Sequence, residues 1–484
     1  MGFDITVKHP DYIAFAPAWE LMRDAYDGED CVKAKGEKYL PMKSGTAAIA
    51  DDRKRKATYD SYRLRAEFPE LVAPTVRGSV GIILKQSATI ELPKSMEFLR
   101  EKATRDGLPL DAFHRRIAAE LLKEGRYGVL PGIDASGNPY LAGYAAESII
   151  NWDEINGAPY YVVLNESGPV RDPETGAWEC EESYRECELV GGVYTSRLWR
   201  QSDRQWVATD EPQAMTRKRQ SLNIFPFVFF GTNDLNAAPD DVPLYGLGKI
   251  SFRIYRMDAD YVHSLHMTSE PTPVVSGFPD PKSAKENDLL PKGIGSSTLW
   301  VLPQGGDAKF LEFTGAGIEA QKTAIDAALE RAVMFGAQAL ANTSRAAESG
   351  DAIQLRLGNQ YSLLHLIAIN SAAGLEKALR NIAIWMGENP DDVKVKPNLE
   401  FFDKPLDAQT LTALVQGWQN GAYSYATLFD RLKRGRVVPD DRTEDDERKL
   451  ITDDPLAPSD MDPSMILPNP SGNSDGNRVG EPAA

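Results

Sequence analysis

The chain has 484 residues, of which 42% are hydrophobic and 26% charged, as in globular proteins with a core. Its formal net charge of −17 argues against a broad basic surface for nucleic acid, because that binding mode neutralises many phosphates. Three cysteines are too few for a disulfide framework, so we expect a reducing compartment. The most apolar long helix, 361–387, contains Glu376, Lys377 and Arg380, which argues against a membrane span. The start lacks the pattern of a signal peptide. We therefore expect a soluble intracellular protein of two to four structural units.

The first 242 residues predict helices followed by an antiparallel β region. Apolar residues at three-four spacing predict helices over 12–26, 52–68 and 110–122. A strand is predicted over 88–92, just before Pro93. From Tyr127 onward, short alternating runs are separated by turn residues, which indicates β-hairpins; the runs are 127–130, 140–145, 160–164, 188–200 and 206–209. A buried strand with one proline is predicted over 223–230.

Two long helices around a short tip are the most distinctive prediction. Residues 246–268 carry apolar side chains on one helical face, and a second face carries Lys249, Arg253, Arg256 and Asp260. The segment Glu270–Pro273 ends this helix, because proline lacks an amide donor. A second helical pattern runs from 316 to 341. Each helix would be roughly 35–40 Å long, which predicts a protruding hairpin.

The second helix is rich in alanine and has a charged seam formed by Glu319, Lys322, Asp326 and Glu330. After it, 342–350 is a small polar segment, and 352–386 predicts another long helix. A predicted strand over 393–402 follows, and then one or two helices over 407–433, joined around Gly421. From residue 438 the chain is acidic and rich in Pro, Asp, Ser, Asn and Gly, which predicts a disordered tail.

No pattern in the chain indicates catalysis. There is no glycine-rich phosphate loop of the Walker type and no Ser-His-Asp or Cys-His set. Cys180 and Cys187 lack histidines at zinc spacing, and His263 and His266 lack a carboxylate pair beyond Asp260. We therefore expect no enzyme activity, no cofactor and no metal.

Several motifs together resemble those of the portal proteins of tailed phages. In the N-terminal region they are His9-Pro10-Asp11-Tyr12, Trp19, Arg23-Asp24 and Gly36-Glu37-Lys38-Tyr39-Leu40-Pro41. Further along are Tyr144–Trp152 and Glu270–Val275. The predicted order also resembles that family: a stem helix, a clip, a second stem helix, a tunnel loop and another long helix. The resemblance spans roughly residues 9 to 400.

The resemblance implies an α+β portal fold with a mixed α/β wing, a long-helix stem, a small clip, a helical C-terminal crown and a disordered tail. The family implies a ring, usually of twelve subunits, at one capsid vertex. Double-stranded DNA would pass through it during packaging and ejection. The partners implied are further copies of the chain, the terminase large subunit, a head–tail adaptor, and the major capsid and scaffolding proteins. The location would be the virion, after assembly in the host cytoplasm, with no membrane involved.

The resemblance also implies a division of the chain. The wing would be 1–242 and 352–403, the stem helices 243–269 and 316–342, the clip 270–315, the tunnel loop 343–351, the crown 404–437 and the tail 438–484. Candidate residues for the channel wall are Lys249, Arg253, Arg256, Asp260, Lys322, Asp326 and Glu330. Candidates near DNA in the tunnel loop are Asn342, Thr343, Ser344, Arg345, Glu348 and Ser349, and candidates for docking on the clip are Pro271, Pro273, Phe278 and Trp300.

Two alternatives stay open at this point. One is a minor capsid protein or head–tail connector of the same virion, which would share composition and location. The other is a nucleic-acid-modifying enzyme built on the β region, with the helices as an interaction arm. The negative charge and the lack of a catalytic set count against the enzyme.

Overall fold

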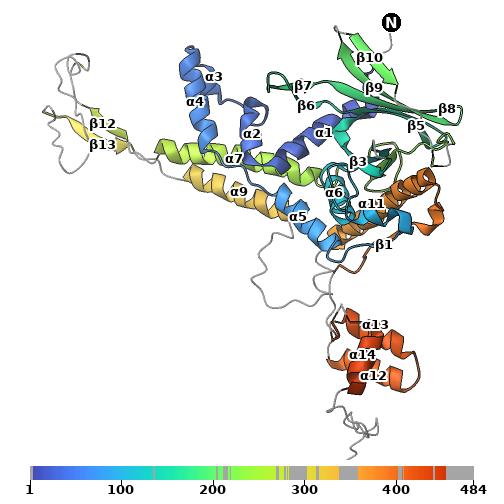
Figure 1. The fold of residues 1–484 in the computed structure, drawn as a ribbon. Helices are drawn as coiled ribbons and strands as arrows, with labels where there is room; N and C mark the ends of the chain where they lie inside the picture. Colours follow the sequence, from blue (N-terminus) through green and yellow to red (C-terminus); the bar gives the residue numbers. More distant parts are fainter. Residues whose placement is uncertain are drawn as a thin grey trace, which may run out of the picture. The chain divides into compact units, whose positions relative to one another are not determined.

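The computed structural model describes residues 4–134, 137–202, 205–210, 216–217, 220–268, 272–276, 280, 282, 302, 304–311, 316–336, 358–401, 406, 408–435, 437–439 and 442–453. The described residues up to 401 belong to one compact unit, and those from 406 onward belong to a second. The chain mixes helices with antiparallel sheets, as expected for the α+β class (Figure 1).

The N-terminal helices include the three predicted over 12–26, 52–68 and 110–122, and three whose bounds were not predicted. They are α1 (Pro10–Asp27), α2 (Glu29–Ala34), α3 (Ser44–Ala47), α4 (Asp52–Arg65), α5 (Val72–Ile83) and α6 (Leu110–Glu124), with 3₁₀ turns η1 (Gly36–Lys38) and η2 (Lys94–Arg100). Local sequence signals mark the start of α1 and the end of α6. At the start of α1, the His9 ring accepts a hydrogen bond from the Asp11 amide at 3.1 Å, and Pro10 occupies the first turn. At the end of α6, Gly125 adopts a left-handed conformation with φ 72°.

The β region forms two main antiparallel sheets. One has five strands in the order β10-β9-β8-β5-β4 and the other has three in the order β11-β2-β3. The strands are β2 (Arg126–Ile133), β3 (Pro139–Ala145), β4 (Ile149–Ile155), β5 (Ala158–Asn165), β8 (Ser183–Val190), β9 (Val193–Ser202), β10 (Gln205–Asp210) and β11 (Val228–Gly231). The turn η3 (Ala146–Ser148) joins β3 to β4, and β6 (Gly168–Arg171) pairs with β7 (Trp178–Glu181).

Two strand predictions were wrong in their extent. The run 188–200 is a hairpin rather than one strand, because Gly191 and Gly192 have φ of 58° and 78° and form a tight turn between β8 and β9. The strand expected over 223–230 is reduced to β11, since Pro226 lies just before it and cannot donate to a ladder. Strand β4 was not predicted.

The long helix α11 (Gly358–Met386) lies in the core of the first unit. Leu364, Ile367, Leu375, Leu379 and Ile382 are fully buried on it. Gly374 allows close packing, because a Cβ there would lie 2.3 Å from the Phe230 ring of β11. The short strand β14 (Lys394–Lys396), within the predicted strand over 393–402, pairs antiparallel with β1 (Thr89–Glu91). The predicted start of the helix, 352–357, lies outside the described residues.

The described part of the second unit contains three helices: α12 (Ala408–Gln419), α13 (Tyr425–Arg434) and α14 (Glu444–Asp453). The first two confirm the predicted helices on either side of Gly421. Helix α14 contradicts the prediction of disorder from 438 onward. Its start is a capping box, in which the Thr443 hydroxyl accepts from the Asp446 amide at 3.2 Å and the Asp446 carboxylate accepts from the Thr443 amide at 3.2 Å. Residues 454–484 of the predicted tail lie outside the described residues.

Candidate functional site: the α7–α9 helical hairpin

Two helices of the first unit, α7 (Tyr245–Thr268) and α9 (Ala316–Met334), pack against each other (Figure 1). With 24 and 19 residues, they are about 36 Å and about 28 Å long at roughly 1.5 Å per residue. Helix α7 has the bounds that its apolar spacing predicts. Helix α9 ends earlier than predicted, because Gly336 adopts φ 119° immediately after Phe335. Residues 337–341 lie outside the described residues.

Two short antiparallel strands connect the C-terminal end of α7 to the N-terminal end of α9 in the chain order. Strand β12 (Thr272–Ser276) comes directly after α7, and β13 (Asp307–Leu311) comes shortly before α9. The two strands are antiparallel partners, with Pro273 opposite Phe310. Of the predicted docking residues, Pro273 therefore lies in β12, while Pro271, Phe278 and Trp300 are outside the described residues. All six tunnel-loop candidates are also outside them.

The first half of α7 is anchored in an aromatic socket. Phe252 stacks on Tyr39 at a ring-centroid distance of 4.2 Å, and Phe68 contacts both Phe252 (5.2 Å) and Tyr255 (5.8 Å). Phe252 and Tyr255 are buried on α7. Contacts between aromatic rings stabilise a structure beyond the effect of the apolar area that they bury. This socket therefore holds the first half of α7 in place.

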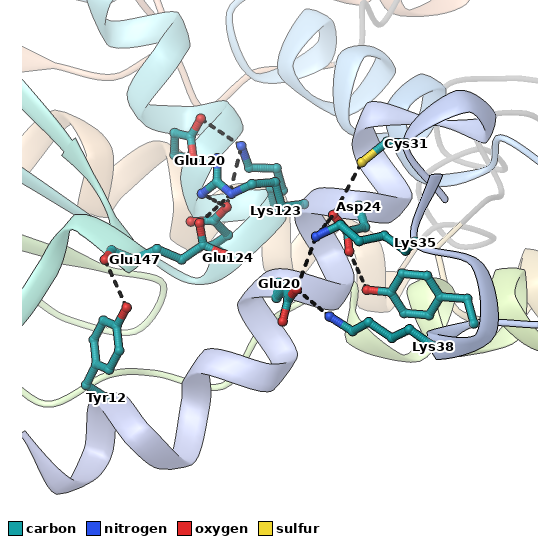
Figure 2. Close-up of polar contacts among 12 residues, drawn as sticks. Tyr12, Glu20, Asp24, Cys31, Lys35, Lys38, Glu120, Lys123, Glu124 and Glu147 are labelled. Carbon is teal, nitrogen blue, oxygen red and sulfur yellow. Dashed lines mark hydrogen bonds and ion pairs between the residues drawn. The ribbon is translucent and has the colours of Figure 1, made fainter. Parts of the chain in front are cut away.

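A partly buried ionic network ties α1, whose Leu21 and Met22 side chains lie against Gly248 of α7, to α6 and to η3 (Figure 2). Arg23 Nη2 lies 2.5 Å from Glu124 Oε1, and Arg23 Nε lies 2.6 Å from Glu147 Oε2. Lys123 Nζ lies 3.6 Å from the same Glu124 oxygen. The Glu124 side chain has no exposed area, and burial together with the nearby Glu120 carboxylate raises its pKa to about 7.

A second cluster connects α1 to the segment that carries the socket. The Tyr39 hydroxyl donates to the buried Asp24 carboxylate, and the Cys31 thiol donates to the same group at 3.4 Å (Figure 2). Burial, and then the Asp24 hydrogen bond, raise the pKa of Tyr39 well above its ordinary value. Lys35 adds a contact at 3.6 Å from Asp24. Asp24 thus orients the Tyr39 ring on which Phe252 stacks.

The N-terminal motif residues meet a third buried group. The His9 ring stacks on Trp152 at 4.0 Å, and the Arg126 guanidinium lies 4.2 Å from the Trp152 ring. Arg126 is almost fully buried, and this burial lowers its pKa to about 9. Its Nη1 donates to the Ala237 carbonyl at 2.6 Å, in the loop that leads to α7. The motif residues His9 and Trp152 thus pack around Arg126, which in turn binds the loop that precedes α7.

Further along α7, Asp260 has partners within the chain. The Tyr62 hydroxyl of α4 donates to Asp260 Oδ1 at 2.8 Å, and Lys43 Nζ lies 3.0 Å from the same oxygen. His263, one turn later, makes an edge contact with the Tyr62 ring at 5.5 Å. Of the candidates for the channel wall on α7, Asp260 is thus used to fasten α4 to the helix.

Helix α9 is poorly buried for its length. On it only Ala328 and Ala332 are buried among the residues whose side chains the structure describes. Larger apolar side chains are exposed: Leu329 at 38% and Met334 at 80%, with Phe335 just after the helix at 52%. Phe335 lies over Gly246 of α7, where a Cβ would approach its ring to 2.6 Å. One side of α9 packs on α7, and the other sides are open.

The remaining candidates for the channel wall other than Lys322, together with Glu319 from the charged seam of the second helix, form two exposed charged stripes of opposite sign. We call Lys249, Arg253 and Arg256 the basic stripe of α7, and Glu319, Asp326 and Glu330 the acidic stripe of α9. Lys249 lies over the Tyr245 ring at 5.2 Å. Within the described part of the chain, none of the six forms a side-chain hydrogen bond or ion pair. Lys322 is also exposed, beside the acidic stripe.

Within the described ranges, no helix is both long and apolar enough to cross a membrane. The same ranges contain no group of three or more His, Cys, Asp or Glu side chains that could hold a metal ion. His263 and His266 are part of this search and do not form such a group.

A family model described as a domain of unknown function, DUF4055, matches residues 243–386. This segment begins just before α7 and ends with α11, so it contains the whole hairpin. No curated protein shows a significant match to the chain.

Several solved structures are similar over most of the chain. The neck of an empty GTA particle, computed with C6 symmetry, is 11% identical with a TM-score of 0.39, covering 76% of this chain and 90% of that chain. A chain from the virion of a native gene transfer agent (GTA) particle is 12% identical with a TM-score of 0.39, covering 78% and 92%. The neck of a native GTA particle, computed with C12 symmetry, is 13% identical with a TM-score of 0.37, covering 75% and 91%. Scores below 0.5 do not establish a shared fold.

Proposed function

We propose that this protein is a portal protein, whose copies form a ring at one capsid vertex through which double-stranded DNA enters and leaves. The observation that carries this proposal is the α7–α9 hairpin. It is held firmly at its base by buried aromatic and ionic groups, and α9 exposes most of its surface.

The exposure of α9 supports assembly. Among the described side chains of this 19-residue helix, only Ala328 and Ala332 are buried, so it gains little from packing, because hydrophobic stabilisation scales with the apolar area removed from water. Leu329, Met334 and Phe335 would be covered if hairpins from neighbouring copies packed side by side. A closed ring supplies such neighbours to every copy, whereas a monomer supplies none.

The charge of the chain suits a conduit for DNA. A net charge of −17 gives the chain an overall repulsion toward phosphates, which would let DNA slide past without being held tightly. In this proposal the motor and the nuclease belong to separate partners.

The other parts take roles that follow from the ring. The segment 270–315, with β12 and β13, would form the clip, where the terminase large subunit and later a head–tail adaptor dock. The segment 343–351 would be the tunnel loop, with Arg345 nearest to DNA. The wing, residues 1–242 and 352–403, would meet the capsid and scaffolding proteins, and the ring would have about twelve copies, the number usual for the family that the sequence resembles.

Native mass spectrometry of the purified full-length chain, over a range of protein and salt concentrations, tests the assembly. We expect closed oligomers with a single dominant copy number. A chain that stays monomeric or forms only compact dimers under every condition, including in the presence of scaffold and capsid proteins, would contradict the proposal. The variant Arg23→Met should form fewer oligomers than the unaltered chain, because it destabilises the base of the hairpin.

A further inference from the structure

The basic stripe of α7 and the acidic stripe of α9 are unexplained by the packing within one copy. Arg253 and Arg256 are exposed on α7, and Asp326 and Glu330 are exposed on α9, without side-chain partners in the described part of the chain. Three cations in a row on a DNA channel would attract phosphates, which opposes free sliding. These charges therefore suit another position in the assembly.

The direction of the acidic stripe follows from helix geometry. Successive residues of an α-helix are about 100° apart, so Asp326 and Glu330 are each about 200° from Ala328. Ala328 and Ala332 are the buried residues that mark the side of α9 packed on α7. The acidic stripe consequently lies on the part of α9 that faces away from α7 of its own copy. It cannot pair with the basic stripe of the same hairpin.

The two stripes lie at matching levels along the hairpin. Phe335 lies beside Gly246, which sets the alignment of the antiparallel helices. Moving along α9 from Phe335 toward the tip at the same rise per residue, Glu330 lies at about the level of residue 251 and Asp326 at about the level of residue 255. Both levels fall between Lys249 and Arg256.

We infer that the acidic stripe of one copy docks on the basic stripe of a second copy of this chain. A rotation about an axis parallel to the hairpin leaves the position of each residue along that axis unchanged. Glu330 and Asp326 of one copy would therefore meet Lys249, Arg253 and Arg256 of the neighbour. Such a contact joins two different surfaces, which generates a ring when the rotation closes.

This inference rests on the proposed ring and adds which surfaces join its subunits. It removes the basic stripe, Asp326 and Glu330 from the channel wall and places them between copies. The cations of one subunit are then neutralised by its neighbour rather than by DNA. Charge pairs of this kind also reject wrong partners, because like charges in contact are repulsive.

The experiment uses two full-length variants with reversed charges. The basic-stripe variant carries Arg253→Glu and Arg256→Glu, and the acidic-stripe variant carries Asp326→Lys and Glu330→Lys. Each variant alone places like charges at every subunit contact, so we expect the association constant per contact to fall at least about tenfold. Lys102→Glu with Arg105→Glu reverses two exposed cations elsewhere and should assemble as the unaltered chain does.

Mixing the two variants in equal amounts provides the decisive measurement. Each contact in an alternating ring then joins opposite charges again, so sedimentation velocity and negative-stain images should show rings restored in the mixture. Recovery on mixing cannot arise from pairing within one chain. Rings that form equally well from either variant alone would overturn the inference while leaving the proposed function intact, as would two deficient variants that fail to recover when mixed. An unaltered chain that forms no ring under any condition would instead overturn both.

Discussion

Replacing Arg23 by methionine tests the buried network at the base of α7. Methionine keeps much of the side-chain volume but removes the guanidinium, whose Nη2 lies 2.5 Å from the fully buried Glu124 carboxylate. Breaking a buried ion pair costs about 3–5 kcal/mol when one charge is left without a partner. Lys123 remains 3.6 Å away and Arg23 is 30% exposed, so we expect about 2–3 kcal/mol.

The loss should depend on pH in a defined direction. The pKa of Glu124 is raised to about 7, above its ordinary value of 4.5, so the folded chain binds this proton more tightly than the unfolded chain. Its contribution to stability therefore falls as the pH rises from 4.5 through 7. Without Arg23, the ionised carboxylate has less compensation, and the deficit should be larger at about pH 8 than at about pH 5.5.

Urea unfolding followed by tryptophan fluorescence measures both effects, since Trp19 on α1 is fully buried. Adding Glu124→Gln to Arg23→Met should recover most of the loss, because the buried side chain that lost its arginine partner is then neutral, while Lys123 keeps its ion pair with Glu120. As a control, Lys396→Met removes an exposed pair with Glu91 and should cost less than about 1 kcal/mol. A loss for Arg23→Met no greater than this control, or an equal loss at both pH values, would refute the reasoning.

Three further predictions concern packing, pH and capping. Gly246→Ala should destabilise the end of α9 by about 1–2 kcal/mol, because the new methyl group would collide with the Phe335 ring. The effect should be seen as faster hydrogen exchange at the end of α9. The control Gly81→Ala, in open space on α5, should be neutral or stabilising. His114 is buried with its pKa lowered to about 4, so unfolding measurements should show His114→Gln removing an acid destabilisation that grows to about 3 kcal/mol as the pH falls from 6.5 to 4. Thr443→Ala should destabilise α14 by about 1 kcal/mol, measured as loss of its exchange protection.

Much of the secondary structure was predictable because it is encoded locally. The three-four spacing of Leu247, Ile250 and Ile254 is visible in the sequence and corresponds to the buried side of α7. Two local signals were present but missed: the Gly191-Gly192 turn between β8 and β9, and the Thr443–Asp446 capping box of α14. In these places the failure lay in the interpretation rather than in the sequence.

The arrangement of the site could not be predicted in the same way. The contact between Arg23 and Glu124 joins residues that are 101 positions apart, and no periodic pattern connects them. Likewise, Lys249, Asp260 and Asp326 were assigned together to a channel wall, because periodicity shows that residues share a face without showing what covers it. Packing distinguishes them: Asp260 binds Tyr62 and Lys43, while the other two remain open.

A reconstruction of the assembled full-length protein by electron cryomicroscopy tests the central claim most directly. The account predicts a closed ring with an open axial channel, walled by the α7–α9 hairpins and ending in the β12–β13 hairpins. Density for a ring whose hairpins point away from the axis, or for a particle without a central channel, would contradict it.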